Sequence, residues 1–361
     1  MPSFARAIRE AYLEILGREA DPGGLASWDR NMNLGLSEAE MREALLRSPE
    51  YAVRNPGLPL RERLGLNGHI PSDAILEDIA LNLRMRWVRI DFDWFRIQPE
   101  QASFHWEEWD RVVLHASERG LEVLATLAYT PPWASPNQAS PKISDPPAST
   151  TFWTDFVRQA VGRYRDRVRY WQLWNEPNIT QFWTGSMALY RTQILEAGAA
   201  AARSVHPGLR VVAPGLANIR DWRAWFAEAM KARDVIDVVN HHNYQTSGRE
   251  VVLELERDQP SRPSLRTLIR QNGVEDRPFW ITETGLRSSE GDQRRYYEDV
   301  VAVLGEREWV ERLFFFHYWD GPGAGNGGFG IVNEDFSPKP AYRFLQSALA
   351  PPALRAEGNR T

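Results

Sequence analysis

From about residue 60 onward, short apolar runs alternate with longer stretches of helical periodicity, and this alternation constrains the fold more than any other feature of the sequence. Strand-like runs separated by helices indicate parallel βαβ units. Eight runs have this character, namely residues 64–70, 87–94, 121–129, 168–174, 209–214, 235–244, 278–282 and 312–319. We therefore predict a parallel α/β fold for this part of the chain.

The number of units favours a closed (β/α)₈ TIM barrel over residues 60–350, since such a barrel needs roughly 250 residues. An open doubly wound sheet is the alternative. It would need a phosphate-binding loop after its first strand, and residues 65–70 offer none. We expect residues 1–55 to form a small all-helical domain and residues 351–361 to form a tail.

The composition excludes several classes of protein. The sequence has no cysteine, so disulfides, thiolate zinc sites and cysteine nucleophiles are excluded. A net charge of −5 argues against a nucleic-acid partner. We expect no membrane span, because no long apolar window exists. Without a signal-like segment at the start, we expect a cytoplasmic location unless export follows another route or a signal has been trimmed.

Polar and aromatic residues follow nearly every predicted strand. In a (β/α)₈ barrel the loops after the strands carry the chemistry, so these residues should share one rim. The residues concerned are Asn67, His69, Arg89, Asp91, Asp93, Asn175, Glu176, His241, His242, Tyr244, Glu283, His317, Trp319 and Asp320. A barrel with a purely structural role would not need carboxylates and imidazoles there.

Two of these residues, Glu176 and Glu283, each end a strongly apolar strand. They follow the fourth and seventh strands, so they should face each other across the mouth of the barrel. Paired carboxylates in this arrangement suit glycoside hydrolysis, in which one is the acid and the other the nucleophile. The structural alternative is that both residues are exposed glutamates in turns. It is the weaker interpretation, because two glutamates in one chain each end an apolar strand.

The sequences WNEPN at 174–178, HHNYQ at 241–245 and WITETG at 280–285 resemble the clan A retaining glycoside hydrolases. FGIVNEDFSPKPAYRFL is similar to the closing segment of many members. Within the clan the chain most resembles family 39, which includes β-xylosidases and bacterial exopolysaccharide hydrolases, and family 5 comes second. The resemblance covers about residues 60–350 and agrees with the barrel prediction.

The resemblance implies a role for several residues. Glu176 would be the general acid/base and Glu283 the nucleophile, with no metal or organic cofactor. Asn175 would bind the sugar 2-hydroxyl, and Tyr244 would donate a hydrogen bond to Glu283. Arg89 near Glu283 would keep that carboxylate ionised. Trp319 would form the floor under the sugar ring that is cleaved.

The histidines leave alternatives open. His241 and His242 are adjacent, so on a strand they face opposite sides, and parity with Tyr244 places His242 in the pocket and His241 against a helix. A metal site would use His69, His242 and His317, but the first strand lacks the His-x-His pattern expected for such a site. We therefore expect no metal. His69 either contacts substrate or has only a structural role.

Some further residues have two interpretations each. Asp91 and Asp93 share a face with Arg89, and they either pair with that arginine or contact substrate. The chain has 15 tryptophans, which serve either an aromatic core or sugar binding. We expect Trp133, Trp183 and Trp319 to touch sugar.

Two signature patterns point away from other functions. The glycines at 323–328 match GxGxxG formally, but no helix follows, so we interpret them as a flexible loop rather than a phosphate cradle. No GxSxG motif is present, which disfavours an esterase.

The first 55 residues have helical periodicity and clear helix boundaries. Asp21-Pro22 is a helix start, Ser37 with Glu40 forms a capping box, and Gly17 ends the first helix. The string YLEILGREADPGGLASW resembles DUF4214, a helical domain of unknown function found in bacterial surface and polysaccharide-related proteins. We expect this domain to pack on the barrel or to dock a partner.

Together these features predict a retaining glycoside hydrolase that cleaves a β-linked poly- or oligosaccharide, with a bacterial exopolysaccharide as one candidate. A transglycosylase would use the same two glutamates. A carbohydrate-binding pseudoenzyme would bind without turnover. An assembly protein would act through its helical domain alone.

Overall fold

The computed structural model describes residues 3–46, 48, 50, 58–219, 221–287, 289–321 and 327–350. Its contacts divide the chain into two compact units, residues 1–61 with 348–361 and residues 62–347. Most of the glycine-rich loop at 323–328 and the tail at 351–361 fall outside the described residues. Within the described residues, no helix combines the length and apolar character that crossing a membrane requires.

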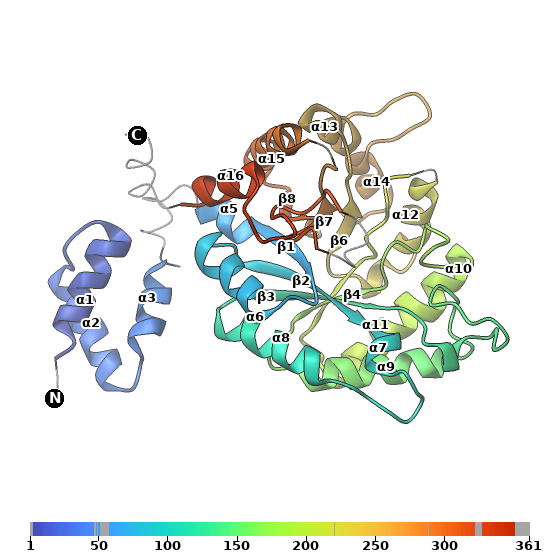
Figure 1. Ribbon diagram of the computed structural model, residues 1–361, viewed down its shortest axis with the longest axis horizontal. Coiled ribbons are helices and arrows are strands. Elements are labelled where there is room, and N and C mark those ends of the chain that lie inside the picture. The colour runs from blue at the N-terminus through green and yellow to red at the C-terminus, as the bar shows by residue number, and fades with distance from the viewer. Residues whose placement is uncertain are drawn as a thin grey trace. The chain divides into compact units, whose positions relative to one another are not determined.

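The larger unit is a (β/α)₈ barrel, as the alternation predicts. Figure 1 shows its strands at the centre with helices around them. The parallel strands are β1 (Leu64–His69), β2 (Trp87–Asp93), β3 (Glu122–Ala128), β4 (Tyr170–Leu173), β5 (Arg210–Val212), β6 (Val239–His242), β7 (Phe279–Thr284) and β8 (Val310–Phe315). They pair in the order β5-β4-β3-β2-β1-β8-β7-β6. A parallel bridge from Val212 to Val238 brings β5 beside β6 and completes the ring.

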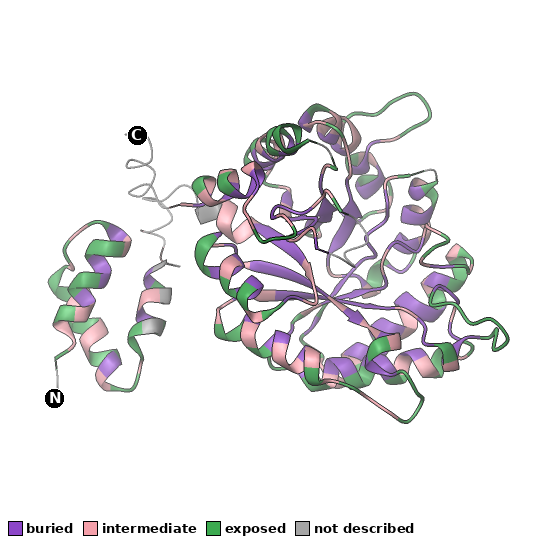
Figure 2. Cartoon of the chain, in the orientation of Figure 1, coloured by how far each residue is buried: buried purple, intermediate pink, exposed green. Residues whose placement is uncertain are grey.

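Amphipathic helices cover the outside of the barrel. They turn buried faces to the strands and exposed faces outward (Figure 2). The helix α5 (Leu58–Arg63) directly precedes β1. The α-helices that follow it are α6 (Asp73–Glu77), α7 (Trp94–Ile97), α8 (Glu107–Glu118), α9 (Thr150–Tyr164), α10 (Met187–Leu189), α11 (Ala197–Val205), α12 (Trp222–Met230), α13 (Gly248–Glu256), α14 (Leu265–Gln271), α15 (Glu290–Gly305) and α16 (Pro340–Ala348). Wider π-helical turns at Asp78–Asn82 and Tyr190–Glu196 follow α6 and α10, and single 3₁₀ turns lie at Pro132–Ala134 and Arg233–Val235.

Aromatic rings fill the barrel near the amino ends of β1 and β2. Trp87 and Trp280 lie edge to face with ring centroids 5.2 Å apart, and Phe314 packs beside both. Gly65 makes room for them, because a Cβ there would lie 2.7 Å from Trp87 and Phe314 atoms. These tryptophans therefore belong to the core, as their place inside predicted strands suggests.

The smaller unit contains α1 (Ala5–Ala11), which continues as a π-helical turn over Tyr12–Leu16, α2 (Pro22–Asn33) and α3 (Glu38–Leu46). Gly17 ends the first helix at a φ of 62°. The Asp21 carboxylate caps α2 by accepting from the Gly24 amide at 2.8 Å, and Ser37 with Glu40 forms the expected capping box. This unit has its own core around Ile8, Met32 and Met41.

Candidate active site

Glu283 lies near the carboxyl end of β7, and both of its carboxylate oxygens accept hydrogen bonds. Arg89 Nη1, from β2, donates to Oε1 at 2.8 Å, and the Tyr244 hydroxyl donates to Oε2 at 2.7 Å. Burial alone would lower the pKa of Arg89, but the negative charges of Glu283 and Asp91 outweigh it and raise that pKa. The site therefore provides a fixed positive charge and an additional hydroxyl donor to the Glu283 side chain.

Arg89 also orients the amides beside the two glutamates. Its Nη1 donates to Asn67 Oδ1 at 2.6 Å, and its Nη2 donates to Asn175 Oδ1 at 2.8 Å. Asn175 Nδ2 in turn donates to the Tyr129 hydroxyl at 3.2 Å. The resemblance implied that Arg89 lies near Glu283, and the structure shows that its guanidinium also holds Asn67 and Asn175.

Glu176 follows β4 on backbone that ordinary side chains rarely adopt. Trp174 has a φ of 78° and Glu176 a φ of 41°, which for non-glycine residues is a strained conformation of the kind found at functional sites. The Glu176 amide donates to the Gly215 carbonyl at 3.0 Å, which holds this turn against the end of β5. Burial raises the pKa of Glu176 to about 7.

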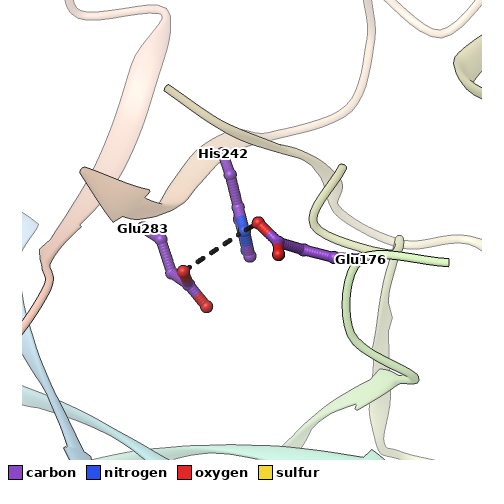
Figure 3. A group of neighbouring side chains, drawn as sticks. All are labelled: Glu176, His242 and Glu283. Atoms are coloured by element: carbon purple, nitrogen blue, oxygen red, sulfur yellow. Dashed lines mark hydrogen bonds and ion pairs between the residues drawn. The ribbon is translucent and has the colours of Figure 1, made fainter. Parts of the chain in front are cut away.

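His242, at the end of β6, lies between the two glutamates (Figure 3). Its Nδ1 is 2.8 Å from Glu176 Oε1 and 3.4 Å from Glu283 Oε2. The ring is fully buried, and burial lowers the pKa of His242 to about 3, so the imidazole is neutral. Gly215 permits this position, since a Cβ there would lie 1.8 Å from His242 Nε2.

The spacing of the two carboxyl groups bears on the stereochemistry of any reaction between them. One oxygen of Glu176, one of Glu283 and a nitrogen of His242 all lie within 4.8 Å of one another. Retaining glycosidases place their carboxyl groups about 5–5.5 Å apart and inverting enzymes about 6.5–9.5 Å apart. The observed spacing corresponds to the retaining arrangement.

These three residues also have spacing that a metal ion could use, so their fit to one needs testing. Arg89 and Tyr244 already occupy the oxygens of Glu283, and Glu176 and Thr282 occupy the two nitrogens of His242. A bound cation would also lie beside the Arg89 guanidinium. The donor set is therefore a poor fit for a metal ion.

His241 lies on the opposite side of β6 from His242, as strand alternation predicts. His241 faces away from the pocket and stacks on Trp222 of α12, with ring centroids 4.2 Å apart. His69 Nδ1 lies 2.8 Å from Asp91 Oδ2. Burial alone would lower the pKa of His69, but the hydrogen bond that the ring donates to Asp91 and the negative charge of Asp91 raise it. Asp91 Oδ1 is also 3.8 Å from Arg89 Nη1, so Asp91 lies beside both His69 and Arg89.

Asp93, at the end of β2, has no such close partner. Its carboxylate lies 3.7 Å from the Arg96 guanidinium. Burial and the negative charge of Asp91 raise the pKa of Asp93 to about 7. We expected each aspartate either to pair with Arg89 or to contact substrate. Asp91 pairs with Arg89, whereas Asp93 lines a cavity.

Two of the three tryptophans expected to touch sugar lie away from the cavity that contains the glutamates. Trp183 is buried, and its Nε1 donates to the Ser186 carbonyl at 3.2 Å. Trp133 packs edge to face on Trp94, and its Nε1 donates to the Gln98 carbonyl at 2.8 Å. Neither lines the cavity that contains the glutamates. Their loops fold back on the barrel, and this satisfies each indole N–H within the protein.

Trp319 lines the adjoining cavity instead of the one with the glutamates. β8 ends at Phe315, which leaves Trp319 in the following loop, stacked on Phe336 with centroids 5.1 Å apart. Phe316 and Phe329 line the central cavity, and we did not single them out from the sequence. The apolar run 313–316 was the available signal for Phe316.

Three cavities adjoin along this rim. The central one, of about 580 Å³, contains both glutamates with Asn175, Tyr129 and Phe182. It shares His69 and Asp91 with a cavity of about 550 Å³ beside β1 and β2. On its other side it shares Asn218, Ile219 and Tyr244 with a cavity of about 860 Å³ beside α13.

The sequence model described as glycosyl hydrolases family 39 matches residues 82–304, which is more than half of the chain. The chain belongs to family 39 of the glycosyl hydrolases. The match confirms the resemblance drawn from the three motifs. A second model, described as a domain of unknown function (DUF4214), matches residues 4–55 and confirms the resemblance of the helical unit.

Curated relatives of this family 39 chain include two named beta-xylosidases. The one from Geobacillus stearothermophilus is 28% identical over 232 residues, covering 55% of this chain and 45% of the relative. The one from Caldicellulosiruptor saccharolyticus is 26% identical over 231 residues, covering 56% and 46%. The chain thus spans about half the length of the curated relatives it matches.

Solved structures share the fold of the barrel. A monomeric beta-xylosidase from Caulobacter crescentus CB15 matches with a TM-score of 0.65 and 19% identity, covering 81% of this chain and 68% of the other. A family 39 glycoside hydrolase from Bacteroides cellulosilyticus WH2 matches with a TM-score of 0.61 and 18% identity, covering 81% and 64%. These likenesses agree with the barrel topology.

Proposed function

We propose that this family 39 chain is a retaining β-glycosidase in which Glu176 is the general acid/base and Glu283 the nucleophile. The observation that carries the proposal is a pair of closely spaced carboxyls in opposite environments. Glu283 meets a cation and a hydroxyl donor, whereas Glu176 is buried against a neutral imidazole. Double displacement requires one ionised and one protonated carboxyl, and these surroundings favour that division.

The reaction proceeds in two steps. Glu283 attacks the anomeric carbon while the bond to the leaving oxygen breaks, and the Glu176 proton passes to that oxygen. A covalent glycosyl ester on Glu283 remains. Glu176, now ionised, takes a proton from water, whose oxygen attacks the same carbon and releases Glu283. Two inversions retain the configuration, and Glu176 ends protonated as it began.

Other residues of the central cavity position the sugar. Asn175, held by Arg89, is placed to bind the 2-hydroxyl, and this contact strengthens in the transition state. Phe316 takes the floor position that we expected of Trp319, since its ring lines the cavity between Tyr244 and Phe329. His69, held by Asp91, offers a further contact at the edge shared with the adjoining cavity.

We propose a β-linked poly- or oligosaccharide as the substrate, and a bacterial exopolysaccharide is the first candidate to test. Two features support a substrate of several sugar rings. Cavities adjoin the central one on both sides, so a sugar chain can continue past the glutamates in each direction. The stacked Trp319 and Phe336 line one of them and offer apolar surface to a neighbouring sugar ring.

Azide rescue tests the two roles separately. With an activated aryl β-glycoside, Glu283→Ala should lose turnover, and azide should restore it with a glycosyl azide of inverted configuration. Glu176→Ala should still form the glycosyl enzyme, so azide should give the retained configuration. Unchanged turnover in Glu283→Ala, or identical azide products from both variants, would refute the assignment. Products from a panel of β-glycans then identify the substrate.

A further inference from the structure

We infer that Thr282 fixes the tautomer of His242 and thereby keeps the acid proton on Glu176. The inference rests on the proposed role of Glu176 and names a positioning residue, Thr282, that does not touch substrate. It follows from a buried column of side chains beneath the glutamates. The column consists of Gln172 on β4, Asn240 on β6, Thr282 on β7 and His242.

Backbone groups fix the orientation of both amides in this column. Asn240 Nδ2 donates to the Ala213 carbonyl at 3.1 Å, and its Oδ1 accepts from the Thr282 amide at 3.3 Å. Gln172 Nε2 donates to the Trp174 carbonyl at 2.9 Å. A carbonyl can only accept and an amide N–H can only donate, so neither side chain can flip without losing these bonds.

The hydroxyl of Thr282 therefore faces two acceptors. Its Oγ1 lies 2.9 Å from Asn240 Oδ1 and 3.3 Å from Gln172 Oε1. The single hydroxyl proton goes to one of these oxygens, and the nearer is Asn240 Oδ1. His242 Nε2 is 3.1 Å from the same hydroxyl oxygen, whose remaining capacity is to accept. Nε2 must then carry the imidazole proton.

A neutral imidazole with its proton on Nε2 has a lone pair on Nδ1. This lone pair points at Glu176 Oε1, 2.8 Å away, and a carboxylate there would place two acceptors in contact. A protonated Glu176 donates to Nδ1 instead. A hydrogen bond from the neutral acid favours the protonated form, in the same direction as burial.

The charges around this pair come from the neighbouring strands. Arg89 on β2 and His241 on β6 act to lower the pKa of Glu176. Glu283 on β7 and Asp91 on β2 act to raise the pKa of His242, whereas Arg89 and His241 lower it. The Tyr244 hydroxyl is engaged with Glu283. Among the described groups, Glu176 is thus the one whose proton can occupy the short contact to Nδ1.

Nitrogen NMR on the full chain tests the tautomer directly, without reference to activity. In protein labelled with ¹⁵N-histidine, the His242 signals can be assigned by their absence in His242→Gln. We expect the shifts of a neutral ring protonated at Nε2 at pH 6. A ring protonated at Nδ1, or at both nitrogens, would overturn the inference. This result remains decisive even if the proposed glycosidase activity fails.

Variants test the consequence for Glu176. Thr282→Val removes the acceptor for Nε2–H while leaving the backbone amide that serves Asn240. The imidazole proton can then move to Nδ1 and donate to an ionised Glu176. We expect the pH midpoint of the basic limb of kcat/KM to fall by about one unit. A shift of this size corresponds to one hydrogen bond that stabilises the ionised carboxylate instead of the neutral acid.

Two controls accompany this variant. Thr282→Ser keeps the hydroxyl, so the pH midpoint of the basic limb should not change. Thr126→Val makes the same change at a buried threonine on β3 whose Oγ1 has no hydrogen-bond partner, so it too should keep the limb. An unmoved limb in Thr282→Val, or an equal shift in Thr126→Val, would overturn the inference. If Thr282→Val fails to fold, the tautomer measured in the unmodified protein decides.

Discussion

Glu176 and Glu283 are the same side chain, and their surroundings alone separate the two roles proposed for them. The Arg89 guanidinium reaches Glu283 directly, whereas Glu176 meets a buried imidazole that carries no charge. Desolvation penalises the charged form of a carboxyl unless a cation compensates it. Arg89 donates a hydrogen bond to Glu283 and not to Glu176, so burial can raise the pKa of Glu176.

The pH dependence of kcat/KM should therefore have a basic limb near pH 7, set by Glu176 in the free enzyme. Glu176 must be protonated to act as the acid, so activity is present below this pKa and lost as the pH rises through it. Glu176→Gln should abolish the limb and slow substrates with poor leaving groups most. Aryl glycosides with activated leaving groups need little protonation, so equal losses on both substrate types would contradict the acid role.

Arg89→Met should separate charge from packing at the nucleophile. The substitution leaves the buried Glu283 without its cation, so we expect a loss of about 10²–10³ in kcat and a destabilisation of about 3 kcal/mol. Kinetics with an aryl glycoside and urea denaturation would measure the two effects. Arg158→Met, on the exposed side of α9, is the control and should change neither. Wild-type kcat in Arg89→Met would exclude the proposed electrostatic role.

At the scale of elements, strand ends decide which aromatic rings reach the sugar. The predicted eighth strand ran to Trp319, whereas β8 ends at Phe315. Residues 316–319 lie in the following loop, which carries Trp319 onto Phe336 and leaves Phe316 at the central cavity. Periodicity locates a strand but does not fix where it ends, and a displacement of three residues exchanges one aromatic ring for another.

Phe336→Ala tests whether the adjoining cavity binds a neighbouring sugar. Phe336 is 52% exposed and stacks on Trp319. We expect KM for oligosaccharides to rise about tenfold, the effect of losing one aromatic contact, with KM for an aryl monoglycoside unchanged. Phe104→Ala, which removes a similar stacked ring outside the three cavities, is the matched control. Equal effects on short and long substrates would argue against a subsite there.

At the scale of the whole molecule, the features that the sequence predicted are those set by local pattern. Alternation identified the barrel, and the strand-end rule brought Glu176, Glu283, Arg89 and Tyr244 to one rim. The position of His242 between the glutamates was beyond such reasoning. It depends on the missing side chain of Gly215, which follows β5, and on the amides beneath it. Contacts of this kind form across the barrel and leave no periodic signal along the chain.

The helical unit offers the last test, because it has a core of its own around Ile8 and Met41. The glutamates and the residues that hold them all belong to the larger unit. Units with separate cores generally fold independently, so deleting residues 1–55 should leave the barrel folded, with kcat/KM on an aryl glycoside within about twofold of the full chain. Binding or turnover of an insoluble polysaccharide, measured alongside, would fall only if the unit docks the enzyme to that material. Loss of cooperative thermal unfolding in the truncated protein would show instead that the barrel depends on the helical unit for its stability.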